Sequence, residues 1–572
     1  MKDNMKPCEH SLTEDAIYKE VVVIGNGPSG MVTSFMLAGN VPYLKEIPED
    51  LPIDEMLRAR LSNLPAGQSL YDVDLMELAE GLEGRSQNPI PLLMDNLLRP
   101  CADMGIQADS LIEWRYDVEK QIEHIVLGRG PPGGAWHTFA PRVRTLSPGA
   151  WLTLPPHAAR GAQRLSARAV ANYCRRYVHA CRLQRYFRCG VVVNSVTRMP
   201  PALGSHCHYE NCPLKADYCV SGYDEGEARP FRYACRRVVV ACGAGDRANT
   251  LQPQVARHAL HSLAAVERAV NTLAVHESRS PPSVVVIGSG VSAADGVWMC
   301  LRAGLHVRHL HRAPADALAR LSPQAYPDYC QVYKMMCDGP SGNHKNYTPY
   351  PEHIIVDVQT LSTDLTDIED YALTLKRVKL LNLVTNETTD LDVSLICVFI
   401  GSKPNLYFLQ TNFNINYDMK MDCECVKPVF KRKIVEKQCF LRNHWHYLKS
   451  VLEQSIQTCK SKYLNLTEIN GNTESKCVNI DCNRLDVISC DETKIDCECS
   501  DPYTNGIGYG LDANKPVDSK SNPVAIDKST HEMLNAPKGL YALGPLTADN
   551  FVRFIPGGAL ALVSHMHKDR VI

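Results

Sequence analysis

The feature that most constrains this chain is a run of four β-branched residues, Val21–Ile24, that leads directly into a Gly-x-Gly-x-x-Gly segment. Because parallel strands are apolar on both faces, the run predicts a buried strand. Met31–Ala38 then predicts a helix that ends at Gly39. A glycine motif between such a strand and such a helix is typical of dinucleotide-binding proteins. The alternative is an ordinary glycine-rich turn.

Each part of this motif has an expected role in holding a nucleotide. Gly25 permits the tight turn, Gly27 lets the backbone approach a pyrophosphate, and Gly30 lets the helix pack closely on the strand. Pro28 and Ser29 stand at the start of the helix, where free N–H groups and the positive end of the helix dipole face the phosphates. We therefore expect these five residues to bind a cofactor.

A second strand–turn–helix begins at Ser283–Ile287 and continues through Gly288, Gly290 and Ala293 in Gly-x-Gly-x-x-Ala form. Ser292 is expected to belong to the same cofactor-binding turn. The next predicted strand ends near His311–Arg312 without the acid that NAD-binding proteins place there for a ribose hydroxyl. Arg312 could pair with a 2′-phosphate instead, which favours NADPH. The alternative is that Arg312 is only an exposed side chain.

The region between the two motifs resembles the flavin-dependent monooxygenases. A predicted strand, Ile122–Leu127, leads toward Gly133, Gly134 and Trp136, which match the Gly-Gly-x-Trp turn that lies against the flavin in that family. The resemblance implies that these three residues bind FAD. Gly128 stands where the family carries an acid for the adenosine ribose, so one charge-assisted anchor is missing.

The C-terminal part continues this resemblance. Gly544-Pro545 stands where such flavoproteins usually have Gly-Asp beside the flavin ribityl chain, and Asp549 is expected to replace that acid. More closely, the chain resembles the oxidative-stress-induced growth inhibitor family. Three strings carry this: GPLTADNFVRF at 544–554, YPDY at 326–329 before Lys334-Met335-Met336, and TLSP at 145–148. The resemblance covers about residues 20–410 and 503–566, and it implies a role in growth restraint, cell death or cytokinesis.

Composition is that of an ordinary protein with a large core. The 572 residues carry a net charge of -2, which gives no general attraction to nucleic acid. The sequence shows no signal peptide and no apolar run long enough to span a bilayer. For this reason we expect the 23 cysteines to be thiols in a reducing compartment. Their odd number also argues against a complete disulfide framework. We expect a cytoplasmic protein, with midbody, mitochondrial or nuclear association left open.

These features predict an α/β fold with two Rossmann-like dinucleotide-binding domains and helical and irregular insertions. The expected organisation is a polar tail at 1–19, an FAD-binding domain at 20–280 with a helical insertion at 40–121, an NADPH-binding domain at 281–385, a return to the FAD domain at 386–410, a Cys-rich and disordered insertion at 411–502, and the end of the FAD domain at 503–572.

Residues 411–502 match no motif and change composition to Asn, Asp, Lys, Thr and Cys. Cys423-x-Cys425 and Cys497-x-Cys499 could together supply four thiolates to zinc, but the usual Cys-x-x-Cys spacing is absent. We expect no metal site, and we expect this segment to bind protein partners. Cys207 and Cys212 have the Cys-x4-Cys spacing of disulfide reductases but stand far from the first glycine motif, so a reductase is disfavoured.

Two hypotheses remain. The first is an FAD- and NADPH-dependent monooxygenase acting on a small molecule that the sequence does not identify. In such an enzyme the flavin carries the redox chemistry, so no catalytic side chain is assigned. The second is a catalytically weak or inactive regulator that keeps the flavoprotein fold. Gly128 and Pro545, at two positions where an acid is usual, motivate it.

Overall fold

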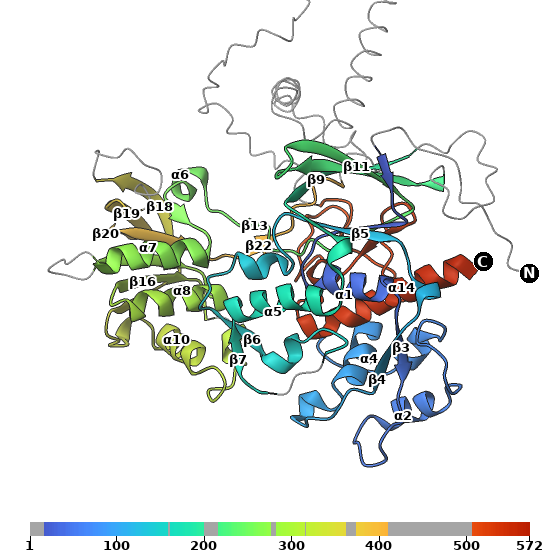
Figure 1. Ribbon diagram of the computed structural model, residues 1–572. Helices are drawn as coiled ribbons and strands as arrows, with labels where there is room; N and C mark the ends of the chain where they lie inside the picture. The colour runs from blue at the N-terminus through green and yellow to red at the C-terminus, as the bar shows by residue number, and fades with distance from the viewer. Residues whose placement is uncertain are drawn as a thin grey trace, which may run out of the picture.

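The computed structural model describes residues 16–157, 161–199, 215–275, 282–314, 316–361, 373–409 and 506–571. Two parallel five-stranded sheets, each with helices packed beside it, form two neighbouring lobes (Figure 1). The α/β prediction with two Rossmann-like domains is confirmed. Three features of the sequence lie outside the described residues. They are the possible zinc ligands within 411–502, the pair Cys207 and Cys212, and the polar tail as far as residue 15.

The first domain is built on a parallel sheet in the order β23-β12-β2-β5-β8. Its strands are β2 (Val21–Ile24), β5 (His124–Gly128), β8 (Phe187–Cys189), β12 (Arg237–Val240) and β23 (Leu540–Ala542). Its main helices are α1 (Pro28–Leu37), α5 (Ala167–Ala180) and α14 (Ile555–Val571). The first and last of these helices pack against each other, so the end of the chain completes the core around the first glycine motif (Figure 1).

The insertion after α1 is framed by a strand pair that the sequence did not predict. β3 (Asn40–Leu44) and β4 (Ile112–Tyr116) pair antiparallel, and the helices α2 (Glu55–Ser62), α3 (Leu75–Leu78) and α4 (Pro89–Leu98) lie between them. These helices are short, with 8, 4 and 10 residues. Asp54 and Asp74 explain where α2 and α3 begin, because their carboxylates accept hydrogen bonds from the first-turn N–H groups.

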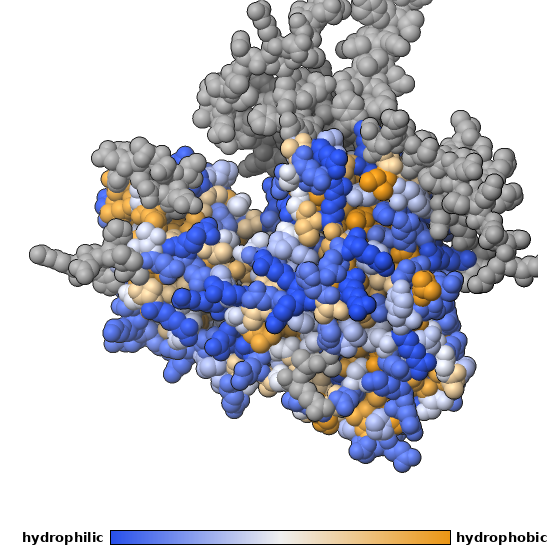
Figure 2. All heavy atoms as spheres, in the orientation of Figure 1, coloured by the Kyte–Doolittle hydropathy of each residue, from blue (hydrophilic) through white to orange (hydrophobic). Residues whose placement is uncertain are grey.

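A second sheet covers each parallel sheet, and its strands are antiparallel except for β1, which pairs parallel with β11. The first domain carries β1 (Ala16–Tyr18), β9 (Val191–Arg198), β10 (Tyr218–Asp224) and β11 (Arg229–Cys235). The second carries the meander β18 (His353–Thr360), β19 (Lys376–Asn382) and β20 (Thr388–Val393). Figure 2 shows a mainly hydrophilic face with apolar side chains gathered on this meander, where Ile354, Leu383 and Val384 are exposed.

The second domain is built on a parallel sheet in the order β14-β21-β15-β16-β17. Its strands are β14 (Ala259–Leu260), β15 (Ser283–Ile287), β16 (His306–His311), β17 (Tyr347–Pro351) and β21 (Leu395–Val398). Its helices are α6 (Pro253–Ala256), α7 (Leu263–Val275), α8 (Val291–Arg302), α9 (Asp316–Ala319) and α10 (Pro327–Asp338).

Two expected domain boundaries are wrong. β14 and α7 belong to the second domain, which therefore begins before residue 281. The strand within 386–410 was expected in the first domain, but β21 pairs with β15 and β14. A continuous apolar run predicts that a strand is buried, but it does not show which strand lies beside it. For this reason the sequence predicted the wrong sheet for this strand. The chain crosses between the domains at β13 (Arg247–Ala248) and β22 (Ser402–Lys403), which pair antiparallel.

Candidate dinucleotide-binding sites and the neighbouring pocket

The first glycine turn joins a fully buried β2 to α1, and no side chain in the described part of the chain caps this helix. Gly25 has φ +115°, and a Cβ there would lie 2.3 Å from the Ala241 carbonyl oxygen. A Cβ on Gly30 would lie 1.9 Å from the Gly25 carbonyl oxygen. Packing therefore requires these two glycines, whatever the turn binds.

Gly27 differs, because apart from its two neighbours in the chain no atom of the described residues lies within 4 Å of the place its Cβ would take. The space beside it is open, and it adjoins the uncapped N-terminus of α1. Uncapped N–H groups and open space are what an anionic pyrophosphate requires of a helix N-terminus. The residues present at this turn therefore fit a dinucleotide.

The Gly-Gly-x-Trp segment lies beside this turn. Gly133 donates its N–H to the Asn26 carbonyl at 2.9 Å, and a Cβ on Gly134 would lie 3.1 Å from the Gly27 Cα. Both glycines have positive φ, +123° and +55°. Trp136 is half-buried and packs on the core of the first domain. The structure thus brings together two groups of predicted residues that are about a hundred positions apart.

Gly128, at the expected acid position, is covered by the side chain of Asn26, which no sequence motif singles out. Asn26 is 4% exposed, and its Nδ2 donates to the Gly130 carbonyl at 2.6 Å. A Cβ on Gly128 would lie 2.1 Å from the Asn26 Cγ. Asn26 and an acid at 128 therefore exclude each other in this arrangement, because they need the same space.

The C-terminal loop closes over the start of α1. Gly544 has φ +73°, and a Cβ there would lie 2.4 Å from the Ser29 hydroxyl. Asp549 is 1% exposed and accepts hydrogen bonds from the Ser86 hydroxyl and from the Asn88 Nδ2, the latter at 2.9 Å. Burial raises the pKa of Asp549 to about 7. Both of its carboxylate oxygens are thus engaged by the insertion, through residues more than 450 positions away.

The second glycine turn repeats the first in its backbone. Gly288 has φ +128°, and a Cβ there would lie 2.3 Å from the Phe399 carbonyl oxygen, whereas the place of a Cβ on Gly290 is open among the described residues. As at α1, none of the described side chains caps α8. Ala293 is fully buried, which explains why a small residue is needed there, and Ser292 is exposed. This turn also fits a dinucleotide.

Histidines support the second turn, and the sequence did not indicate them. His309 is fully buried, and its ring joins the Gly288 carbonyl at 2.7 Å to the Tyr347 hydroxyl at 2.9 Å. His311 follows on the same side of β16, with its ring centroid 5.1 Å from that of His309. Arg312 comes next and is exposed.

Two of the resemblance strings meet at the seam between the domains. Tyr326 donates its hydroxyl proton to the Leu146 carbonyl, and Arg164 pairs with Asp328 at 3.2 Å. The Arg164 guanidinium lies 4.8 Å from the ring centroids of Tyr326 and Tyr329. The first residues of the segment 326–336 therefore hold the two domains together.

Behind the seam, Tyr329 donates a hydrogen bond to Asp295 on α8 at 3.0 Å. Burial raises the pKa of Asp295 to about 7. The buried Asp549 in the first domain and the half-buried Asp295 in the second thus share a raised pKa.

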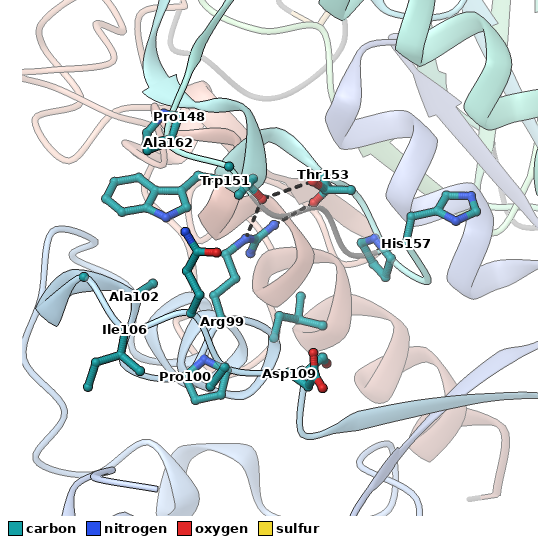
Figure 3. A pocket seen from close by; sticks show the side chains of 18 of the residues that line it. Arg99, Pro100, Ala102, Ile106, Asp109, Pro148, Trp151, Thr153, His157 and Ala162 are labelled. Carbon is teal, nitrogen blue, oxygen red and sulfur yellow. Dashed lines mark hydrogen bonds between the residues drawn. The ribbon is translucent and has the colours of Figure 1, made fainter. Parts of the chain in front are cut away.

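A pocket of about 270 Å³ lies between the insertion and the loop that follows β6 (Arg144–Pro148) (Figure 3). Its lining is mainly apolar and includes Leu98, Ile106, Trp114 and Trp151. The loop returns through β7 (Arg164–Ser166), which pairs with β6. The pocket therefore adjoins the strand that carries Leu146 to the domain seam.

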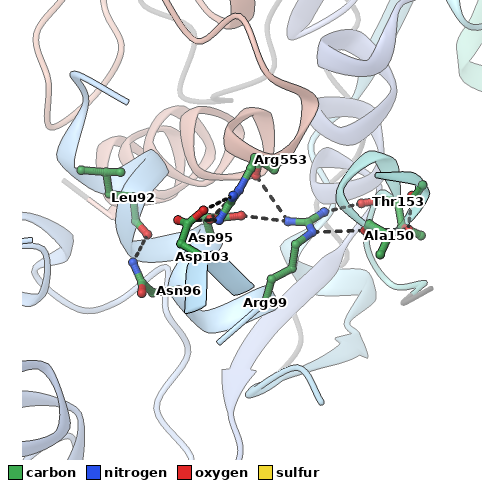
Figure 4. A network of polar contacts seen from close by, with 9 residues as sticks. Leu92, Asp95, Asn96, Arg99, Asp103, Ala150, Thr153 and Arg553 are labelled. Carbon is green, nitrogen blue, oxygen red and sulfur yellow. Dashed lines mark hydrogen bonds and ion pairs between the residues drawn. The ribbon is translucent and has the colours of Figure 1, made fainter. Parts of the chain in front are cut away.

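A buried ionic network fixes the walls of this pocket (Figure 4). Arg553 and Asp95 are 3% and 5% exposed, and the Arg553 Nε donates to Asp95 at 2.8 Å. Arg553 also donates to Asp103 at 2.8 Å and lies 4.2 Å over the Trp151 ring. Arg99 donates to the Asp95 carboxylate at 3.2 Å and to the Thr153 carbonyl at 2.6 Å. The network joins α4, the pocket loop and the start of α14.

Individual known proteins with similar sequences show which family this chain belongs to. No family model matches the chain. The chain is 30% identical to the mouse (Mus musculus) oxidative stress-induced growth inhibitor 1, over 96% of this chain and 95% of that protein. It is 28% identical to the human (Homo sapiens) oxidative stress-induced growth inhibitor 2, over 97% and 94% respectively.

Among solved structures, the bacillithiol disulfide reductase from Staphylococcus aureus aligns with a TM-score of 0.46 and 12% identity, over 97% of this chain and 99% of that one. A structural similarity this weak gives no evidence about any reaction of this chain. Within the described residues, no helix has the length and apolar character needed to cross a bilayer.

Proposed function

Because the chain belongs to the oxidative stress-induced growth inhibitor family, we propose that it is an FAD- and NADPH-dependent monooxygenase that acts in growth control. FAD would bind at Gly25–Gly30 with Gly133, Gly134, Trp136 and Gly544, and NADPH at Gly288–Arg312. Cell death and cytokinesis are the further processes that the resemblance suggests. One observation carries the proposal: in two separate turns, the middle glycine faces open space while the first glycine is closed in by packing.

The chain's own residues would bind, orient and shield the cofactors. The N-termini of α1 and α8 supply uncapped N–H groups for the two pyrophosphates. Trp136 and the turn before it would exclude water from one side of the first site. The seam formed by Tyr326, Arg164 and Asp328 fixes the angle between the domains. FAD, when bound, would accept a hydride and activate oxygen.

The pocket beside the network is our candidate entrance for the oxygen acceptor. Its volume suits a small molecule, and its mainly apolar lining favours a substrate with little charge. Arg99 holds the pocket loop through its carbonyl groups, so the wall is ordered before any ligand arrives. A cytoplasmic location and protein partners bound through 411–502 also belong to the proposal, and these rest on sequence alone.

Two observations favour the second function, a regulator with weak or no catalysis. Asn26 fills the space of the missing acid at Gly128, and Asp549 is engaged by Ser86 and Asn88. Related flavoproteins hold FAD with an acid at the first of these positions, and Asp549 is the residue predicted to do so at the second. Such a protein would keep the fold and use it to sense nucleotides or to dock partners.

Purification of the full chain separates the two functions. A yellow protein with a flavin spectrum that NADPH bleaches in the absence of air is the expected result for the enzyme. A colourless protein that added FAD does not reconstitute, and that consumes no NADPH, would support the regulator. Product analysis with small apolar amines, sulfides and ketones would then test the acceptor.

A further inference from the structure

We propose that His311 recognises the 2′-phosphate of NADPH at the second glycine turn. The inference rests on the proposed function of that turn and adds the side chain that reads the adenosine ribose. The sequence predicts that Arg312 pairs with the 2′-phosphate, and the structure adds His311.

Strand register places His311 at the ribose position. In the first domain, Ile24 pairs with Leu127, and the next residue is Gly128. In the second domain, Ile287 pairs with Leu310, and the next residue is His311. Proteins of this fold hold the ribose with the residue at the end of this strand. His311 and Gly128 are therefore equivalent, although their side chains share nothing.

The state of the ring points to a ligand. His311 is 5% exposed, and neither ring nitrogen has a hydrogen-bond partner among the described residues. His309, its neighbour on the same side of the strand, has both nitrogens hydrogen-bonded. Leaving a buried polar group without a partner is unfavourable, so such groups in native proteins need an explanation. A bound phosphate oxygen would supply the missing partner.

The path to such a contact is short. His309 joins the Gly288 carbonyl, and its ring lies 5.1 Å from that of His311, which places His311 beside the turn. No hydrogen bond within the described residues holds the His311 ring, so rotation about its side-chain bonds toward the nucleotide breaks none.

The local charge suits a phosphate better than two free hydroxyls. A carboxylate at this position accepts hydrogen bonds from the ribose hydroxyls of NADH and repels a 2′-phosphate. Here the position holds an imidazole, which donates a hydrogen bond, followed by the cationic Arg312. The nearest carboxyl group on α8, Asp295, is already bonded to Tyr329. The end of β16 thus carries a hydrogen-bond donor followed directly by a cation, and both suit a 2′-phosphate.

Nucleotide binding without turnover tests the inference on the full chain. Adenosine 2′,5′-bisphosphate and AMP are titrated by calorimetry, and the ratio of their dissociation constants is measured. The native protein should prefer the bisphosphate, and His311→Gln should reduce that preference about tenfold. His311→Glu should reverse the preference in favour of AMP. His306→Gln is the control, because His306 lies at the other end of β16 and bonds Thr348, and it should leave the ratio unchanged.

Three results separate the possible failures. If neither nucleotide binds the native chain, the proposed function of the second turn fails together with this inference. If both bind equally, the turn keeps its function and phosphate recognition fails. If His311→Gln keeps the native ratio, His311 is not the recognising residue.

A measurement on the native protein covers the case in which the variants do not fold. Deuterium exchange at the C2 position of histidine, read by mass spectrometry with fragmentation that separates His311 from His309, reports on this ring directly. The bisphosphate should change the exchange rate of His311, and AMP should not. An unchanged rate with both nucleotides would overturn the inference.

Discussion

At the end of β5 the first domain has Gly128 beneath the Asn26 side chain, whereas at the matching place on β16 the second domain has the unbonded ring of His311 beside exposed Arg312. The two turns are otherwise alike, since Gly25 and Gly288 meet backbone carbonyls at the same 2.3 Å and Gly27 and Gly290 face open space. The two glycine turns thus share their backbone geometry but differ in the residue at the end of the neighbouring strand.

The domains also differ in what surrounds the turn. The first is closed by distant segments, the insertion at 40–121 and α14, which a buried ionic network joins. The second is formed from one continuous stretch and is capped by a meander with apolar side chains at its surface. The first domain therefore depends on long-range polar contacts that the second does not need.

The largest effect should come from filling the open glycines. Gly27→Val should abolish FAD retention and leave adenosine 2′,5′-bisphosphate binding intact, and Gly290→Val should do the reverse, because each side chain would enter the space of one pyrophosphate only. Flavin absorbance and calorimetry measure the two losses, and thermal unfolding checks that both variants fold. Loss of both ligands in either variant would contradict the independence of the turns.

Next in size is the network of the first domain. Arg553→Leu leaves the buried Asp95 carboxylate with weaker compensation and should lower the free energy of unfolding by about 3–5 kcal/mol in urea denaturation. The matched control is Arg377→Leu, which removes an ion pair with Asp392 whose side chains are nearly half exposed, and it should leave the free energy of unfolding almost unchanged. Equal effects would show that the network contributes no more than a surface pair.

The buried carboxyls should make each domain sensitive to pH. Burial raises the pKa of Asp549 and of Asp295 to about 7, so the stability each contributes is fully present below about pH 4 and is lost as pH rises through 7. The native chain should be less stable at pH 8 than at pH 5, by at most roughly 3 kcal/mol for each group, because part of the loss has already occurred at pH 5. Asp549→Asn and Asp295→Asn should each flatten part of this dependence in thermal unfolding. If neither variant changed the dependence of stability on pH, the raised pKa values of the two aspartates would be contradicted.

The smallest effect concerns the first ribose position. Gly128→Glu alone should destabilise the chain by about 1–3 kcal/mol, because the new side chain displaces Asn26. Asn26→Ala with Gly128→Glu should recover that loss and tighten FAD binding about tenfold, since an acid can then reach the ribose. Denaturation and FAD titration are carried out on the two single variants and on the double variant. Together they give the coupling free energy between Asn26 and Gly128. Additive effects would show that the two residues do not share this space.

The sequence predicted both strand–turn–helix units because the evidence is local, a β-branched run and glycines at fixed spacing. It could not predict that Asn26 covers Gly128, because that contact depends on how β2 and β5 are aligned. It could not predict the partners of Asp549 either, since Ser86 and Asn88 come from an insertion far away in the chain. The placement of β21 failed for a similar reason, because an apolar strand fits either sheet.

The discontinuity of the first domain has a consequence for synthesis on the ribosome. The second sheet is complete once β21 has emerged, but the first lacks its edge strand β23 and the helix that packs on α1 until residues 540–571 are made. During translation the earlier-started domain must therefore finish later. A nascent chain halted after Lys403 should protect β15 and β16 from protease while leaving β2 open to cleavage.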